Sequence, residues 1–302
     1  MVAVAPEAQS PDTCLLRPGN TNCGGCGMSN GLTLLGRALE AAGDTCTLVI
    51  PACCGIVTAG RYPTTSYGVP TIATTFASSA AVATGVATIR DLNDEPGQVI
   101  CWAGDGGTYD IGLATLSAAA ERNENIIYIC YDNEIYGNTG GQRSSATPAG
   151  ATTATTPFGK NQGKKDIMSI MMAHRIPYAA TLSIAHPEDF AQKISTALSL
   201  KGLRFLLIHS PCPTGWKSEP EDSVALVRMA VASGLFMVYE VYDGATYRIN
   251  VRSDGSDPTE YFAKQRRFKD EELNMDAIRN WCTRRTRRLA SLEAQFPHPQ
   301  NR

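Results

Sequence analysis

Residues 98–133 read QVICWAGDGGTYDIGLATLSAAAERNENIIYICYDN, and this stretch decides the fold class. Its two short runs of apolar and β-branched residues, 98–103 and 125–131, predict buried strands. Residues 111–121 are rich in Ala and Leu and predict a helix between the two strands. A strand, a helix and a second strand in this order form a crossover unit, so we expect a parallel sheet covered by helices.

The same alternation continues on both sides of this unit. The predicted strands are 47–50, 178–183 and 204–209, and the predicted helices are 32–42, 77–90, 166–174 and 187–200. Residues 137–165 contain many Thr, Gly, Ala and Ser and predict a long loop, which in a compact domain is usually functional. The predicted fold class is α/β, with a parallel sheet flanked by helices.

The character of the chain changes at each end, which predicts three parts. Residues 1–13 form an arm, 14–227 form the α/β domain, and 228–302 form a C-terminal extension. The extension contains β-like runs at 236–242 and 247–251 and a helix over 271–289 with an arginine-rich end. We expect this extension to bind a partner chain.

Composition excludes several classes of protein. The 302 residues are 43% hydrophobic, and 27 Lys and Arg balance 29 Asp and Glu to a net charge of −2. Such a balance argues against a nucleic-acid or membrane-surface binder. The first residues resemble no signal peptide, and the uncharged stretch 62–89 is too rich in Thr and Ser for a membrane span. We expect a soluble, cytoplasmic protein with reduced or metal-bound cysteines.

Polar side chains follow both strands of the central unit. Gly104, Asp105 and Gly106 end one strand and Asn133 follows the other, so they share the sheet edge at which ligands bind. Glycines let the backbone approach a phosphate, and Asp and Asn oxygens suit a Mg²⁺ ion that bridges a diphosphate. A Gly-Asp-Gly triplet alone is a common turn. Its spacing to Asn133 is the pattern of a thiamine diphosphate site.

The ten cysteines carry a second signal. Cys23 and Cys26 form a Cys-x-x-Cys in a Gly-rich turn, and the pair Cys53-Cys54 and the single Cys212 each follow a predicted strand. A zinc knuckle, a redox pair and a [4Fe–4S] cluster all remain open from spacing alone. The other cysteines are expected to be buried small side chains: Cys14, Cys46, Cys101, Cys130 and Cys282. The histidines show no metal spacing, and Lys164-Lys165 is expected at the surface.

A series of motifs, from about residue 15 to 270, resembles the β subunit of pyruvate:ferredoxin oxidoreductase and its 2-oxoacid relatives. These motifs are NCGGCG at 22–27, IPACCG at 50–55, GDGGTYDIG at 104–112, YDNEIYGNTGGQ at 131–142, RSSATPAGATTATTPFGK at 143–160, GKKDI at 163–167, PCPTGW at 211–216, SGLFMVYEVYDGATYRIN at 233–250 and KQRRFK at 264–269.

The resemblance implies roles for named residues. Mg²⁺ would be held by Asp105, the side-chain oxygen of Asn133 and the carbonyl of Ile135. The diphosphate would be held by Gly104, Gly106, Tyr136, Gly137, Asn138 and Thr139. Asn138 would act in catalysis, near the thiazolium and the 2-oxoacid. One [4Fe–4S] cluster would be ligated by Cys23, Cys26, Cys54 and Cys212, with Cys53 as the alternative to Cys54.

The resemblance also implies a reaction and partners. A 2-oxoacid, CoA and oxidised ferredoxin would give acyl-CoA, CO₂ and reduced ferredoxin, reversibly, with pyruvate favoured by NTGGQ and RSSATP. Oxalate, phenylglyoxylate and branched-chain 2-oxoacids, a non-oxidative thiamine diphosphate decarboxylase, and a non-catalytic cluster-carrying subunit are the alternatives. The Glu that activates the cofactor would come from a pyrimidine-side α subunit. Ferredoxin-like δ and γ subunits or domains would carry electrons onward, so the chain would be active only with partners.

Overall fold

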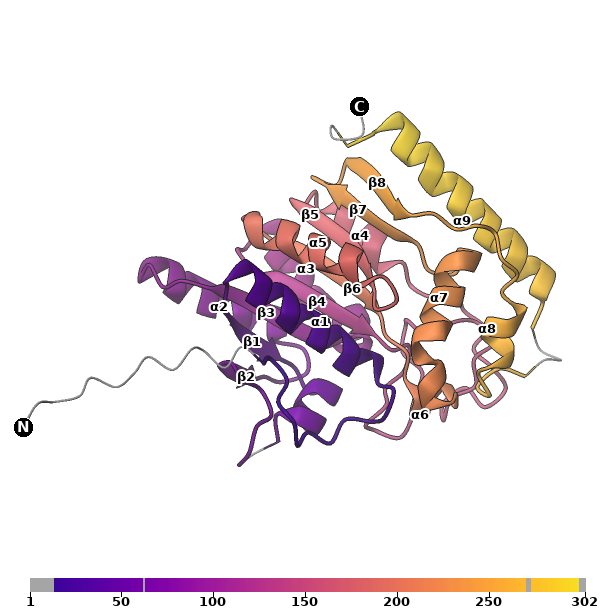
Figure 1. Ribbon diagram of the computed structural model, residues 1–302, viewed down its shortest axis with the longest axis horizontal. Helices are drawn as coiled ribbons and strands as arrows, with labels where there is room; N and C mark the ends of the chain where they lie inside the picture. The colour runs from indigo at the N-terminus through magenta and orange to yellow at the C-terminus, as the bar shows by residue number, and fades with distance from the viewer. Residues whose placement is uncertain (1–13, 62, 270–272, 299–302) are drawn as a thin grey trace, which may run out of the picture.

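The computed structural model describes residues 14–61, 63–269 and 273–298, so the arm predicted over 1–13 lies outside the described residues. One eight-stranded sheet runs through this part of the chain in the order β2-β1-β3-β4-β6-β5-β7-β8 (Figure 1). The strands are β1 (Cys46–Ile50), β2 (Thr71–Ala73), β3 (Gln98–Gly104), β4 (Ile127–Asp132), β5 (Tyr178–Ser183), β6 (Arg204–His209), β7 (Val238–Tyr242) and β8 (Thr246–Val251).

The strand directions confirm the predicted parallel α/β sheet. Every pair from β2 to β5 is parallel, whereas β7 pairs antiparallel with β5 and β8 pairs antiparallel with β7. Strands buried on both faces are expected for a sheet covered by helices, and every residue of β1, β4, β5 and β6 is buried. As a result, the carboxyl ends of β1, β3, β4 and β6 lie in a row at one edge.

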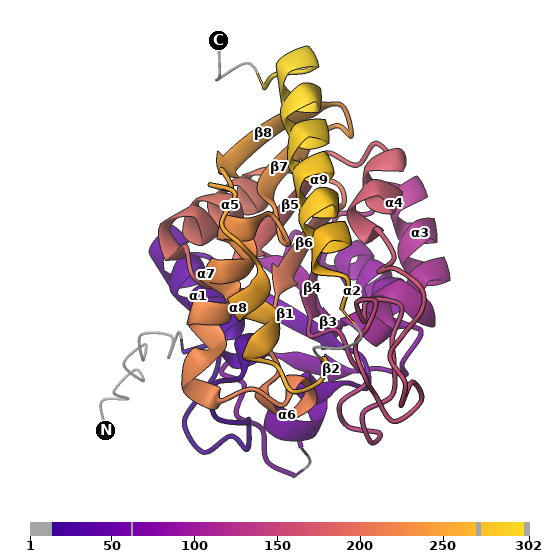
Figure 2. The ribbon, with the colours of Figure 1, turned by 90° about the vertical axis from the view of Figure 1, so that its right-hand side faces the viewer.

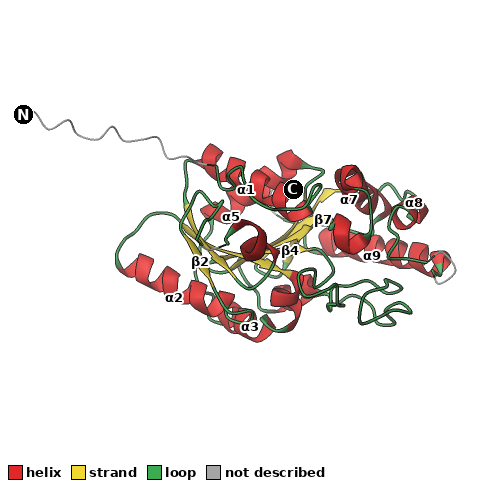
Figure 3. Ribbon diagram, turned by 90° about the horizontal axis from the view of Figure 1, so that it is seen from below, coloured by secondary structure: helices red, strands yellow, loops and turns green. Residues whose placement is uncertain are grey.

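Helices cover both faces of the sheet, with α1 and α5 on one side and α2 and α3 on the other (Figure 3). The helices are α1 (Gly27–Ala42), α2 (Ser79–Leu92), α3 (Leu113–Glu121), α4 (Ile167–Ala173), α5 (Pro187–Ser199), α6 (Pro213–Trp216), α7 (Ser223–Ser233), α8 (Thr259–Ala263) and α9 (Met275–Gln295). Short π-helical turns are η1 (Gly55–Ala59) and η2 (Gly106–Asp110), and η3 (Pro220–Asp222) is a 3₁₀ turn.

The helical periodicity of α1 explains its place on the sheet. Leu32, Leu35 and Leu39 recur at helical spacing and are buried, and Gly43 ends the helix in the left-handed conformation, with φ 62°. The helix begins at Gly27, five residues before the predicted start at 32, because the Gly-rich turn before it continues directly into helix.

Several elements were not predicted from the sequence. Strand β2 is only three residues long and is defined by its pairing with β1, for example Leu48 with Thr71. Helices α6, α7 and α8 lie between Cys212 and the predicted helix 271–289, where only β-like runs were expected. The loop prediction is confirmed, because no helix or strand lies between the end of β4 at Asp132 and the start of α4 at Ile167.

The C-terminal extension continues the sheet before it forms its long helix. Helix α9 packs along β8, where the N–H of Ile249 donates to Glu293 Oε1 at 2.7 Å and the N–H of Tyr247 donates to the carbonyl of Phe296 at 2.9 Å (Figure 2). Four arginines of α9 are exposed: Arg279, Arg284, Arg287 and Arg288. No helix within the described ranges has the length and apolar character needed to cross a bilayer.

The start of α1 is fixed against the end of β6 by close backbone contact. The N–H of Gly27 donates to the carbonyl of Pro211 at 2.9 Å, and a Cβ on Gly27 would lie 2.6 Å from the Pro211 nitrogen. A Cβ on Gly25 would lie 2.2 Å from the carbonyl oxygen of Pro220. These contacts hold the Cys23–Cys26 turn beside Cys212.

We therefore expect Gly27→Ala to lower the free energy of unfolding by about 1–3 kcal/mol, because backbone atoms must move to admit a methyl group. The matched control is Gly85→Ala in α2, where no atom lies within 4 Å of an added Cβ. That substitution should stabilise the chain by roughly 0.5–1 kcal/mol, since alanine loses less backbone entropy in a helix. Urea denaturation of the full-length chain, followed by circular dichroism, measures both, and equal midpoints for the two variants would contradict the contact.

Candidate functional site

Residues from four neighbouring strand ends meet at the carboxyl edge of the sheet. Cys54 follows β1, Asp105 follows β3, Asn133 follows β4 and Cys212 follows β6. Ligands of open α/β sheets bind at this edge. The topology therefore brings together the hard oxygen donors and two of the cysteines that the sequence singled out.

Asp105 is a buried carboxylate, only 1% exposed, just before the π-helical turn η2. The hydroxyl of Ser144, from the long loop, donates to its Oδ2. Burial raises the pKa of Asp105 well above its usual value and the charge of Asp132 adds to this, against the opposing effects of Ser144 and Lys164. A cation at this position would stabilise the charged form, so the site suits a hard divalent ion.

Asn133 and Ile135 are fixed by contacts with their backbone. The indole N–H of Trp216 donates to the carbonyl of Asn133 at 2.8 Å, and the N–H of Ile135 donates to Asn133 Oδ1 at 3.3 Å. An amide oxygen has a second lone pair, which leaves Asn133 Oδ1 able to bind a metal. The loop 133–135 thus offers an amide and a carbonyl oxygen at the end of β4, the strand that pairs with the one before Asp105.

Neighbouring aromatic rings restrict the space for a side chain at the two glycines that flank Asp105. A Cβ on Gly106 would lie 2.0 Å from the ring of Tyr136, and a Cβ on Gly104 would lie 3.3 Å from the ring of Tyr131. Tyr136 is fixed in turn, since its hydroxyl donates to Asp110 Oδ2 at 2.6 Å. Gly106 lets the Tyr136 turn pack directly on the end of β3.

The predicted diphosphate-binding turn, residues 136–139, is exposed beyond Tyr136. The N–H of Gly141 donates to the carbonyl of Tyr136 at 3.0 Å and closes the turn. At its tip, the side-chain amide of Asn138 donates to the sulfur of Cys54 at 3.2 Å. This contact joins the predicted cofactor turn to the predicted cluster ligands.

Cys53 and Cys54 have different environments. Cys53 is half-buried, its thiol contacts Tyr131, and burial raises its pKa. Burial likewise raises the pKa of Cys54 to about 12, with the charge of Cys212 as the next cause and the Asn138 amide opposing both. Cys54 is therefore the member of the pair that faces the other thiols and the exposed turn.

Cys212 lies close to the Cys-x-x-Cys turn. The N–H of Gly215 donates to its sulfur at 3.3 Å, and burial, together with the charges of Cys26 and Cys23, raises the pKa of Cys212 to about 11. The hydroxyl of Thr214 donates to Cys23 Sγ at 3.8 Å. Across the described residues, no three His, Cys, Asp or Glu side chains lie close enough together to hold one metal ion. In a [4Fe–4S] cluster each thiolate binds a different iron, so the sulfurs lie farther apart.

A buried charge network supports the loop after β4 and was not predicted from the sequence. Lys164 contacts Asp132 Oδ2 at 2.5 Å and Glu134 Oε1 at 2.9 Å, and Arg267 contacts Glu134 Oε2 at 2.6 Å. Lys164 and Lys165 were expected at the surface and are both partly exposed; the Lys164 ammonium pairs with two buried carboxylates, whose charges raise its pKa. The two carboxylates next to Asn133 imply that cationic side chains lie nearby. The sequence alone does not show which lysine and arginine residues these are.

The remaining five cysteines differ in their exposure. Cys46, Cys101, Cys130 and Cys282 are buried as expected, whereas Cys14 is exposed, contrary to the prediction. Cys14 precedes the first packed residue, Leu15, and its thiol donates to the carbonyl of Leu16 at 3.0 Å.

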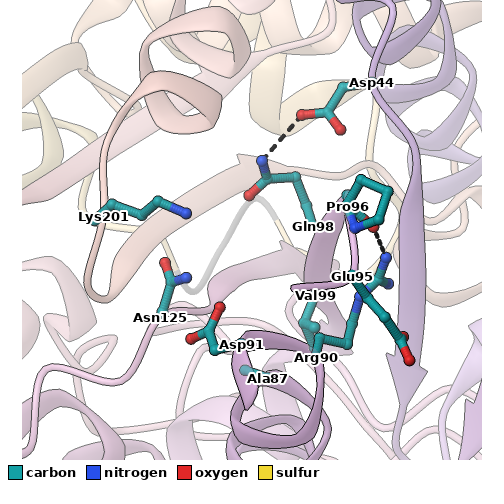
Figure 4. Close-up of a pocket in the computed structure, with 11 residues that line it drawn as sticks. Asp44, Ala87, Arg90, Asp91, Glu95, Pro96, Gln98, Val99, Asn125 and Lys201 are labelled. Carbon is teal, nitrogen blue, oxygen red and sulfur yellow. Dashed lines mark hydrogen bonds between the residues drawn. The ribbon is translucent and has the colours of Figure 1, made fainter. Parts of the chain in front are cut away.

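A polar cavity of about 220 Å³ lies at the opposite edge of the sheet (Figure 4). It is lined by residues near the amino ends of the strands, including Asp44, Arg90, Gln98, Asn125 and Lys201. Gln98 donates to Asp44 Oδ2 at 2.9 Å across it. None of the predicted cofactor or cluster residues lines this cavity, so it is separate from the candidate site.

Comparison with known proteins agrees with this geometry. Residues 52–209 match the family model described as thiamine pyrophosphate enzyme, C-terminal TPP binding domain. The chain is 41% identical over 293 residues to ketoisovalerate oxidoreductase subunit VorB of Pyrococcus horikoshii, covering 92% of this chain and 93% of the relative. It is 43% identical over 266 residues to pyruvate synthase subunit PorB of Methanothermobacter marburgensis, covering 86% and 91%.

A solved structure shares the fold. The 2-oxoglutarate:ferredoxin oxidoreductase of Magnetococcus marinus superposes with a TM-score of 0.60 at 24% identity, covering 74% of this chain and 81% of that one. The family model, the long sequence matches and the sheet topology agree with one another. The chain belongs to the thiamine diphosphate-binding β subunits of the 2-oxoacid:ferredoxin oxidoreductase family.

Proposed function

We propose that this chain is the subunit in which a 2-oxoacid is decarboxylated and its electrons enter an iron–sulfur cluster. In the assembled enzyme, a 2-oxoacid, CoA and oxidised ferredoxin give acyl-CoA, CO₂ and reduced ferredoxin. The observation that carries this proposal is the contact between Asn138 and Cys54, at 3.2 Å. It supports the proposal because electron transfer requires the cofactor and the cluster to lie close together, and Asn138 and Cys54 are the residues proposed to bind them.

Thiamine diphosphate and Mg²⁺ fit the oxygen donors at the ends of β3 and β4. Asp105, Asn133 Oδ1 and the carbonyl of Ile135 would hold the ion, and the exposed turn 136–139 with Gly104 and Gly106 would hold the diphosphate. When bound, thiamine diphosphate supplies the carbanion chemistry that removes CO₂ from a 2-oxoacid. The chain's own residues would bind and orient the reactants, and the exposed Asn138, whose amide donates to Cys54, would contact the substrate.

A [4Fe–4S] cluster fits the cysteines around Cys212. Cys23, Cys26 and Cys212 are linked through the contacts of Gly27 and Thr214, and Cys54 faces them from β1. Burial favours the thiol form of Cys54 and Cys212, so binding of the cluster must release protons. Cys23 is exposed and Cys26 is partly exposed, so an electron carrier would approach the cluster from this side.

Partner subunits complete the site. The chain holds one cofactor-binding half, so a pyrimidine-side α subunit would supply the activating Glu and cover the exposed turn. Two exposed apolar side chains are available for such a contact: Ile111, after η2, is 54% exposed, and Phe158, in the long loop, is 85% exposed. Ferredoxin-like δ and γ subunits or domains would accept electrons from the cluster and pass them to ferredoxin.

Pyruvate is the substrate we propose, because the motifs NTGGQ and RSSATP at 138–148 resemble the pyruvate type. A branched-chain 2-oxoacid is the second candidate, since the match to the ketoisovalerate oxidoreductase subunit spans more of the chain than the match to the pyruvate synthase subunit.

The test of this function is the composition and activity of the complex purified anaerobically with its native partners. We expect about four iron ions and four sulfides on this chain beyond those on the partners, with bound thiamine diphosphate. Pyruvate should reduce ferredoxin in the presence of CoA with a higher kcat/KM than 2-oxoisovalerate, and the isolated chain should be inactive. Thiamine diphosphate with zinc or without iron would instead identify a non-oxidative enzyme.

Matched alanine variants of the adjacent cysteines test the cluster ligand. In the intact complex, Cys54→Ala should abolish the signal of this cluster in electron paramagnetic resonance, because it removes one of four thiolates. Cys53→Ala should retain the signal and the iron, since the Cys53 thiol contacts Tyr131, whereas Cys54 contacts Asn138 of the exposed turn. The reverse result would assign the ligand to Cys53.

A substitution at Asp105 tests the Mg²⁺ site. Asp105→Asn keeps the shape of the side chain but removes its charge, so the complex should lose affinity for thiamine diphosphate by at least about tenfold. Asp91→Asn is the control, because Asp91 is exposed at the cavity on the opposite sheet edge. Equilibrium dialysis against thiamine diphosphate and Mg²⁺ measures both, and equal affinity in the two variants would exclude Asp105 as a metal ligand.

A further inference from the structure

Glu134, between Asn133 and Ile135, has a strained backbone. Its φ is 64°, in the left-handed region that residues other than glycine, asparagine and aspartate rarely adopt. Such a conformation persists only where its surroundings hold it, and it is common at functional sites. The hydroxyl of Thr147 donates to the Glu134 carbonyl at 2.6 Å and contributes part of this restraint.

The carboxylate of Glu134 is held between two cations from distant parts of the chain. Lys164, from the long loop, contacts Oε1 at 2.9 Å, and Arg267, from the segment between α8 and α9, contacts Oε2 at 2.6 Å. Only 5% of Glu134 is exposed, so these two ion pairs are its main electrostatic partners. Glu134 is therefore a buried, ion-paired anchor for the loop.

Arg267 also contacts the group that fixes Asn133. Its guanidinium lies 4.2 Å from the centroid of the Trp216 ring, and the indole N–H of Trp216 donates to the carbonyl of Asn133 at 2.8 Å. Gln265 accepts from Arg267 Nε at 2.9 Å and holds the guanidinium in place. Arg267 is as buried as a core residue, with 1% of it exposed. It is not one of the residues proposed to bind the cofactor, the Mg²⁺ ion or the cluster.

We propose that Arg267 is a positioning residue, which fixes the loop 133–135 from both sides and so sets the oxygens of Asn133 and Ile135 for Mg²⁺. This inference rests on the proposed Mg²⁺–thiamine diphosphate site and deepens it. It assigns to the C-terminal extension, outside the residues 52–209 that match the cofactor-binding family model, a part in holding the metal loop.

Loss of Arg267 should act on metal binding through geometry. Arg267→Met leaves a buried carboxylate with one cation, removes the support of the Trp216 ring, and lets the strained Glu134 backbone relax. The oxygens of Asn133 and Ile135 that are proposed to bind Mg²⁺, on either side of Glu134, should then move. Arg267→Lys keeps the charge but loses the planar fork and the stacking on Trp216, so its effect should be intermediate.

The experiment measures the Mg²⁺ dependence of thiamine diphosphate binding by the intact complex, by equilibrium dialysis at fixed cofactor concentration, together with the thermal unfolding temperature. The variants are Arg267→Met and Arg267→Lys. Arg266→Met is the matched control, since the Arg266 side chain is 69% exposed and pairs with Glu219 at the surface. Arg267→Met should raise the half-saturating Mg²⁺ concentration about 10- to 100-fold, with Arg267→Lys between it and the wild type, and Arg266→Met should stay within about twofold.

The outcomes separate the two levels of the proposal. Half-saturation of Arg267→Met within about twofold of the wild type, or a lowered unfolding temperature with unchanged Mg²⁺ dependence, overturns the positioning role and leaves the proposed function intact. A wild-type complex without Mg²⁺-dependent binding of thiamine diphosphate overturns the proposed function itself. If Arg267→Met does not fold, Arg267→Lys decides by the same criterion: a raised half-saturation supports the role, and an unchanged one overturns it.

Discussion

The parallel pairing of β1, β3, β4 and β6 is the constraint on which the rest of the site depends. Because these four strands run in one direction and lie side by side, every segment that leaves them starts from the same edge. A different polar group follows each of these strands: a cysteine pair after β1, a carboxylate after β3, a carboxamide after β4 and a single cysteine after β6. The apolar strands themselves carry no chemistry, and their burial on both faces fixes the positions of these groups.

Much of this arrangement could be predicted from short stretches of sequence. Apolar runs such as 98–103 and 204–209 are unambiguous because buried strands need them, and the two polar clusters follow strands directly. The loop 137–165 was also predictable, since it lacks any apolar period. Elements that are defined by pairing or packing, such as β2 and α7, could not be predicted. Their sequences are equally compatible with a loop and with a short helix.

The supporting residues of the site were beyond sequence reasoning for a physical reason. A buried Asp132 or Glu134 implies that a cation is near, but any Lys or Arg of the chain satisfies that requirement equally. Only the packed structure selects Lys164 and Arg267, from elements far apart in the sequence. The same holds for Trp216, whose indole reaches the backbone beside Asn133. Reactive residues are found by their local pattern, whereas the residues that orient them are found by contact.

The contact of Gly27 with Pro211 has a consequence for how the protein is made. Cys23 and Cys26 leave the ribosome early, but the backbone that holds them beside Cys212 is synthesised only after β6 and Pro220. During most of translation the first two thiols therefore lack their later counterparts. For the proposed [4Fe–4S] cluster, iron can be inserted only after Cys212 has been synthesised, so the first thiols have to stay reduced through that interval.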